Sequence, residues 1–115
     1  MPYELPKSQK KIARQIIEKG LQREYQKGLE KVDSVIEKWE SGKLDNQKAY
    51  ISMYRKLISH DKHLARRYDN ISGSKYLIII SGQVADGIVS LDELSELNDE
   101  ARQVINKWLE VIKGD

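Results

Sequence analysis

The residues best suited to chemistry gather in one short segment, His60-Asp61-Lys62-His63, followed by Arg66, Arg67 and Tyr68. Both histidines of the chain lie here, and on a helix positions i and i+3 are neighbours that can share a Zn²⁺ ion. Two ligands do not make a metal site, and Asp61 points about 100° away from His60 on a helix. We therefore expect neither a metal nor a cofactor at this cluster.

Asp61 has the more unusual predicted setting. At about 100° per residue it lies within roughly 20° of Tyr50 and Tyr68, in the middle of an apolar stripe. An ionised carboxylate there is costly unless it is paired. One hypothesis is a buried network with an arginine or tyrosine that fixes helix register. The other is a groove for a partner or small ligand, with the candidate binding residues His60, Asp61, His63, Arg66, Arg67 and Tyr68.

Catalytic patterns are missing from the rest of the sequence. There is no cysteine, which removes thiolate metal sites and cysteine nucleophiles, and the glycines form no phosphate-binding loop. The segment from Asp86 to Glu93 resembles half of a calcium-binding loop, but Gly82 and Val84 stand where oxygen ligands are required. A helix stop followed by a Ser90/Glu93 capping box accounts for the same residues. We expect no catalytic residue and no enzyme.

The elements that carry these residues are predicted to be helices. Both prolines, Pro2 and Pro6, fall in the first six residues, so the strongest helix breaker is absent from 7–115. An extended segment 1–7 is followed by helices over about 8–41 and 45–70, with Asp45 as a cap, and by an apolar helix over 75–86. The sequence predicts one all-α domain over 1–115, an antiparallel bundle of four or five helices around this central apolar helix.

Two boundaries leave alternatives open. Gly20 marks either a bend in the long first helix or a point that the helix passes through unbroken. The final segment from Ser90 is either one helix or a short one followed by a longer helix that begins near Asp99. Its apolar residues recur at intervals of three or four and form one amphipathic face: Leu91, Leu94, Leu97, Ala101, Val104, Trp108 and Ile112.

The long first helix carries a seam with coiled-coil spacing. Apolar residues and one glycine recur at intervals of 4, 3, 4, 3 and 4. Such a seam serves two helices of one bundle or two copies of the chain, so a homodimer is expected. The predicted interface residues are Leu21, Tyr25, Gly28, Val32, Val35 and Trp39.

Charge is divided unevenly along the chain. Residues 1–80 hold 17 Lys and Arg against 10 Asp and Glu, whereas residues 81–115 hold 3 against 8. An acidic last helix beside basic earlier ones accounts for this division. The alternative is a basic face for nucleic acid built from Lys10, Lys11, Arg14, Arg66 and Arg67. It is weakened by the acids of the first helix, among them Glu18, Glu24 and Glu30, which make that helix resemble an ordinary solvated face.

No targeting or membrane-spanning segment is predicted. The longest unbroken apolar run, from Tyr76 to Ile80, is far shorter than the roughly 20 residues that a bilayer requires. We expect a cytoplasmic protein.

Four scattered segments carry a resemblance to a known group of proteins. They are residues 3–8, residues 39–42, the block His60-Asp61…Arg67-Tyr68, and residues 87–90. Together they resemble a group of short, uncharacterised bacterial helical proteins, and this resemblance implies no activity or ligand. The function expected first is non-catalytic protein binding or self-association, and a nucleic-acid-associated regulator is the alternative. A small-ligand or metal site around His60 and Asp61 ranks third.

Overall fold

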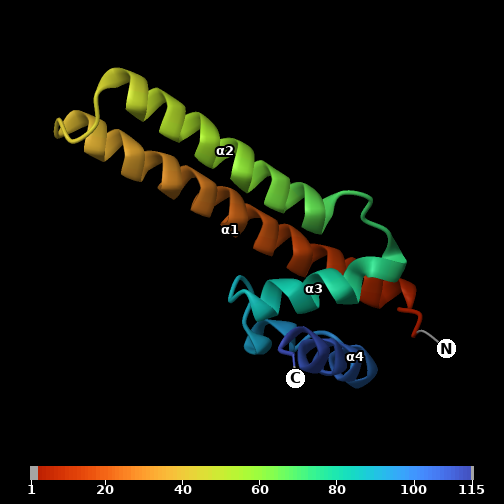
Figure 1. Ribbon diagram of the computed structural model, residues 1–115. Coiled ribbons are helices and arrows are strands. Elements are labelled where there is room, and N and C mark those ends of the chain that lie inside the picture. Colours follow the sequence, from red (N-terminus) through yellow and green to blue (C-terminus); the bar gives the residue numbers. More distant parts are fainter. Residues whose placement is uncertain (1–2, 115) are drawn as a thin grey trace. The chain divides into compact units, whose positions relative to one another are not determined.

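The computed structural model describes residues 3–114, and all of its regular elements are helical (Figure 1). Within these residues there is no strand, which confirms the predicted all-α class and the helix expected over 75–86. The elements are α1 (Lys7–Glu40), α2 (Asn46–Tyr68), η1 (Gly73–Lys75), α3 (Tyr76–Ala85), η2 (Leu91–Leu94) and α4 (Asp99–Ile112).

Side-chain caps fix the starts of two helices. The Asp45 carboxylate accepts the Lys48 backbone N–H at 2.7 Å and so caps α2, as predicted. Asn98 accepts the Ala101 N–H at 2.8 Å and opens α4. The last segment therefore consists of a short helix followed by a longer one, which is the second of the two predicted alternatives. The Ser90 capping box begins only the short η2.

Gly20 does not bend α1, which is continuous over 34 residues. The amide of Gln83 donates to the Ile17 carbonyl at 3.1 Å, directly beside this glycine. A Cβ atom on Gly20 would lie 2.7 Å from the Gln83 Cδ atom. The glycine thus permits the close approach of α3 and is not a hinge.

The chain forms two compact units, and α1 contributes to both. The first unit runs up to Gln22 and resumes at Asn70, whereas the second is Arg23–Asp69. In the first unit α3 packs against α4, and Ile80, Ala101 and Ile105 are fully buried. The packed face of α4 is centred on Ala101, Ile105 and Leu109.

The predicted face of the last segment is confirmed at Leu94, Leu97 and Ala101, which are buried, but it is wrong at the exposed Leu91 and by one residue beyond Ala101. The last three side chains of that predicted face, Val104, Trp108 and Ile112, are partly or largely exposed. The cause is that α4 is apolar over a wide arc, and the packed line runs along one edge of that arc. Apolar spacing identifies such an arc but not the line within it that meets a neighbour.

The second unit is a two-helix hairpin in which α2 runs back along the C-terminal part of α1 (Figure 1). Gly42, with φ of 82°, makes the turn that follows α1. Few residues of the hairpin are buried, and Val35, Ala49 and Leu64 are its aliphatic core. The remaining buried positions are polar, aromatic or glycine: Glu24, Gly28, His60 and Tyr68.

Candidate functional site

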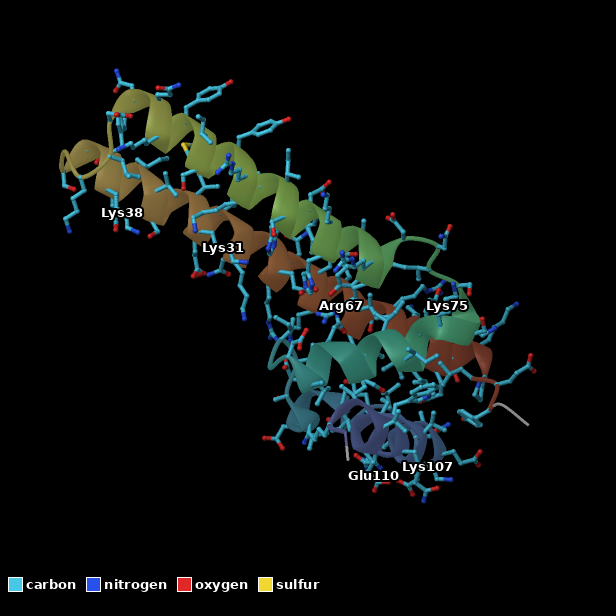
Figure 2. All side chains as sticks on the ribbon, viewed as in Figure 1. Lys31, Lys38, Arg67, Lys75, Lys107 and Glu110 are labelled. Atoms are coloured by element: carbon cyan, nitrogen blue, oxygen red, sulfur yellow. The ribbon has the colours of Figure 1, made fainter. Side chains whose placement is uncertain are left out.

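The core of the hairpin is organised around Glu24, whose residue surface is 2% exposed. One carboxylate oxygen, Oε1, accepts from His63 Nε2 at 2.7 Å and from an Arg67 guanidinium nitrogen at 2.9 Å. The other oxygen accepts a hydrogen bond from the Tyr68 hydroxyl. Figure 2 shows Arg67 between α1 and α2. We call Glu24, His60, His63, Arg67 and Tyr68 the Glu24 cluster.

His60 completes the cluster through the backbone. Its Nε2 atom lies 2.7 Å from the Glu24 carbonyl oxygen, which can only accept, so Nε2 carries a proton. Its Nδ1 atom faces the Lys31 ammonium group at 3.5 Å, which can only donate. The shorter of these two contacts is therefore a hydrogen bond that His60 donates to the backbone of α1. Gly28 makes room for this ring, because a Cβ atom there would lie 2.7 Å from His60 Cδ2.

The electrostatics of the cluster keep Glu24 ionised. Burial alone raises the pKa of a carboxyl group. Hydrogen bonds from Tyr68 and His63 and the positive charge of Arg67 outweigh burial, so the pKa of Glu24 is lowered from its ordinary value. A charged carboxylate that accepts from three side chains of α2 ties the two helices together. Side chains of the protein itself donate hydrogen bonds to both carboxylate oxygens, as in a structural hydrogen-bond network.

Four of the six predicted binding residues meet in this cluster, although not around the predicted centre. His60, His63, Arg67 and Tyr68 all face Glu24, whereas Asp61 and Arg66 are exposed. Asp61 does stand in line with Tyr50, Tyr54 and Leu57, as predicted, but this stripe is exposed, so the buried network hypothesised for Asp61 is wrong. The packed face of α2 follows Ala49, His60 and Leu64, whereas Tyr50 and Tyr54 of the predicted stripe are solvent-exposed.

Glu24 was missed because it was assigned to a solvated helix face. A signal for it exists in the spacing of small residues: Gly20, Glu24 and Gly28 stand four apart, in line with the buried Ile17 and Val35. Two glycines one turn on either side of a carboxylate indicate a line of close helix contact. This spacing places the Glu24 side chain at the helix contact.

The histidine pair does not form a metal site. Both Nε2 atoms are directed to oxygens of Glu24, and the two ring centroids lie 6.0 Å apart. Over residues 3–114, no group of three or more His, Cys, Asp or Glu side chains could hold a metal ion.

The predicted interface on α1 divides into packed and exposed residues. Gly28, which lies beside His60 of α2, and Val35 are buried, and Val32 is half-buried. Tyr25 is 50% exposed and Trp39 is 46% exposed, although the Trp39 indole donates to Asn46 at 2.7 Å. Leu21, which belongs to the first unit, is half-buried.

Large apolar side chains are left exposed along one side of the hairpin. Six of them, three on each helix, lie within an arc of roughly 60–80° at about 100° per residue, whereas Ile51 and Ile58, each 38% exposed, lie outside it. Viewed from the N-terminus of each helix, the exposed arc is rotated in the same sense away from the residues that pack between α1 and α2. Because the two helices are antiparallel, both arcs therefore lie on the same side of the hairpin. We call this surface the apolar face, and it comprises Tyr25, Leu29, Trp39, Tyr50, Tyr54 and Leu57.

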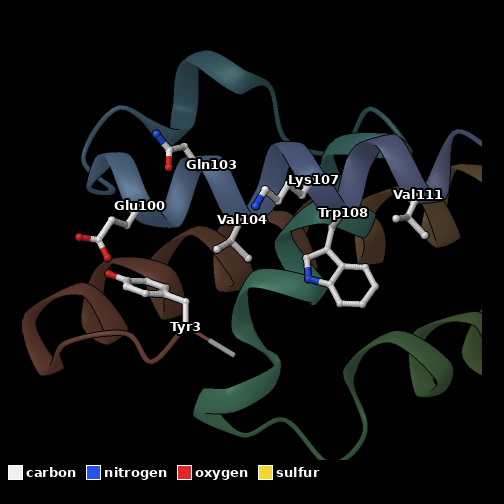
Figure 3. Close-up of a pocket in the computed structure, with 7 residues that line it drawn as sticks. All are labelled: Tyr3, Glu100, Gln103, Val104, Lys107, Trp108 and Val111. Carbon is white, nitrogen blue, oxygen red and sulfur yellow. The ribbon is translucent and has the colours of Figure 1, made fainter. Parts of the chain in front are cut away.

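The first unit carries a groove along α4 (Figure 3). Its volume is about 490 Å³, and its apolar wall is formed by Val104, Trp108 and Val111. Tyr3 lines the groove, and its hydroxyl exchanges hydrogen bonds with the Asn98 side chain at 3.0 to 3.3 Å. Glu100 and Lys107 are its charged residues.

No helix within residues 3–114 is both long enough and apolar enough to cross a membrane. Comparison of the chain with protein families, with curated proteins and with solved structures gives no match.

Proposed function

We propose that the protein is a non-catalytic interaction protein that pairs with a second copy of itself through the apolar face. The observation that carries this proposal is the exposure of six large apolar side chains on one side of a two-helix unit. Leu29 is 67% exposed, Tyr50 76% and Tyr54 61%. A two-helix unit with a small, partly polar core gains most from covering such a surface.

The area of the apolar face is large enough for a homodimer interface. Large apolar side chains carry about 150–250 Å² each, so six of them at these exposures leave on the order of 700 Å² uncovered. That exceeds the roughly 300–600 Å² of the largest patch on an ordinary monomer. It is close to the ~800 Å² per partner of a standard interface. Two copies related by a two-fold axis would each present this same patch and together form a four-helix arrangement.

The Glu24 cluster supports the proposal indirectly. It holds α1 and α2 at a fixed register, which keeps the two halves of the apolar face adjacent. Because its carboxylate is engaged by His63, Arg67 and Tyr68, it offers no group to a substrate. The cluster therefore positions the interaction surface and is not itself a reactive site.

The test is the solution mass measured by light scattering at chain concentrations up to about 100 µM. We expect twice the chain mass of 13.3 kDa, unchanged by high salt because apolar contacts are not screened. The double variant Leu29→Glu/Leu57→Glu should be monomeric with its helix content unchanged. The matched control is Gln26→Glu, which adds a carboxylate to an exposed position of α1 outside the apolar face.

Two results would overturn the proposal. A wild-type chain that stays monomeric over this concentration range does not pair with itself, and the face must then serve a different protein. A dimer that survives Leu29→Glu/Leu57→Glu but is broken elsewhere would use another surface.

A further inference from the structure

We propose that the exposed side of α2 opposite the apolar face binds the phosphate backbone of nucleic acid. Its residues are spaced 4, 3, 4, 3 and 4 apart along the helix, and each is Lys, Arg or Ser. All three residue types donate hydrogen bonds to phosphate oxygens. We call this line the donor seam, and it comprises Lys48, Ser52, Arg55, Ser59, Lys62 and Arg66.

The donor seam is accessible. Five of its six residues are exposed and Ser52 is half-buried. At about 100° per residue the seam occupies an arc of roughly 80°, centred roughly 150° from the apolar tyrosines of α2. A shallow hollow at its N-terminal end is lined by Lys48, Ser52 and Arg55, with Ile51 and Lys56. Pairing of two chains through the apolar face would thus leave the seam uncovered.

The charges of the seam are not balanced along the helix. α2 contains six Lys and Arg residues and a single acidic residue, Asp61, which lies roughly 140° away from the seam. Within the described part of the chain, Lys48, Arg55, Lys62 and Arg66 form no ion pair. An ordinary solvated helix alternates the two signs at i and i+4, because like charges at that spacing are destabilising. Here Lys62 and Arg66 stand at i and i+4.

The geometry fits an extended polyanion. From Lys48 to Arg66 the helix rises roughly 27 Å, at about 1.5 Å per residue. Duplex DNA carries one charge per ≈1.7 Å of its axis, so a segment of that length offers about 16 phosphates to four cations. The contacts are to the backbone, and binding is expected to be independent of base sequence.

This surface differs from the basic face predicted from the sequence. Lys10, Lys11 and Arg14 belong to the first unit, and Arg67 is directed to Glu24. Of the five residues predicted for nucleic acid, only Arg66 lies on the donor seam. The decisive feature is the one-sided charge of α2, which the acidic residues of α1 had obscured.

The experiment is fluorescence anisotropy with the full chain and a labelled 20-base-pair DNA duplex at 50–200 mM salt. For four phosphate contacts, log K should fall with log salt at a slope of about −3.6, a loss of roughly 10²-fold across this range. The variant Arg55→Gln/Lys62→Gln should reduce the slope by about 2 and weaken binding at every salt concentration. The matched control, Lys107→Gln/Lys113→Gln, removes one exposed lysine of α4 and another that directly follows this helix, and it should leave the slope unchanged.

Three outcomes would overturn the inference. One is the absence of binding at 50 mM salt and 100 µM protein. Another is equal binding by the seam variant and the α4 control. The third is equally tight binding, per unit of charge, to polyglutamate or to vesicles containing phosphatidylserine, which would indicate an acidic protein or a lipid surface instead. Light scattering on the seam variant should still give the mass of the wild type, so this test and the self-association test can fail independently.

Discussion

Replacing Glu24 by glutamine tests the central network directly. Glutamine has nearly the same size but carries no charge, so the Arg67 guanidinium, whose side chain is 13% exposed, loses its counter-ion. Removing one partner of a buried ion pair costs about 3–5 kcal/mol. His63 is 41% exposed and recovers solvation on its own, and glutamine retains one acceptor. We therefore expect a loss of about 2–3 kcal/mol in the free energy of unfolding at pH 7, or roughly 10–20 °C in Tm.

The stability difference between the wild type and Glu24→Gln should also depend on pH. The pKa of Glu24 is lowered in the folded chain, so its stabilising effect is fully present above the unfolded value of about 4.5 and is lost as the pH falls through the folded pKa. The glutamine variant cannot titrate at this position. The difference in stability between wild type and Glu24→Gln should therefore be constant near neutral pH and shrink below about pH 4.5.

The assay is urea unfolding followed by circular dichroism at pH 7 and at several values down to pH 3. Glu30→Gln is the matched control, since it removes an exposed carboxylate from the same helix and should change stability by less than about 0.5 kcal/mol. A Glu24→Gln variant as stable as the wild type at pH 7 would refute the reasoning. A stability difference that persists undiminished at pH 3 would refute it equally, because the ionised carboxylate would then not be its source.

Two further predictions concern the packing and the ends of the hairpin. Gly28→Ala should destabilise the chain by about 1–3 kcal/mol, although alanine is the better helix former, because its methyl group would lie 2.7 Å from His60 Cδ2. In urea titrations this penalty should vanish in a His60→Ala background, and a penalty of the same size there would point to another cause. Asp45→Ala should cost about 1 kcal/mol by removing the cap of α2, whereas Asp45→Asn should stay near wild type in thermal unfolding.

The helix boundaries could be predicted because their causes are local. Asp45 and Asn98 are capping residue types, and Gly42 provides the positive φ that follows α1. The burial of the helix over 75–86 followed from its composition in the same way. Each of these features depends on the chemistry of a few neighbouring residues and needs no knowledge of what packs against them.

The sequence predicts less well which face of each helix is packed, because that face depends on the partner helix. On α2 the apolar stripe runs through Tyr50 and Leu57, yet the packed line runs through Ala49 and His60. A hydrophobic pattern shows where water is disfavoured, and in this hairpin much of that surface is not covered by the chain itself. The buried setting hypothesised for Asp61 and the omission of Glu24 have this single origin.

This offset between the apolar stripe and the packed line also bears on function. A hairpin that buried its tyrosines between α1 and α2 would need no ionised core, because apolar burial alone would hold it. Here Glu24 and its donors supply directional contacts along the packed line, which leaves the apolar side chains available on one side and the donor seam on another. Loss of the Glu24 charge should consequently weaken self-association and DNA binding together, whereas Leu29→Glu/Leu57→Glu and Arg55→Gln/Lys62→Gln should each remove only one of them.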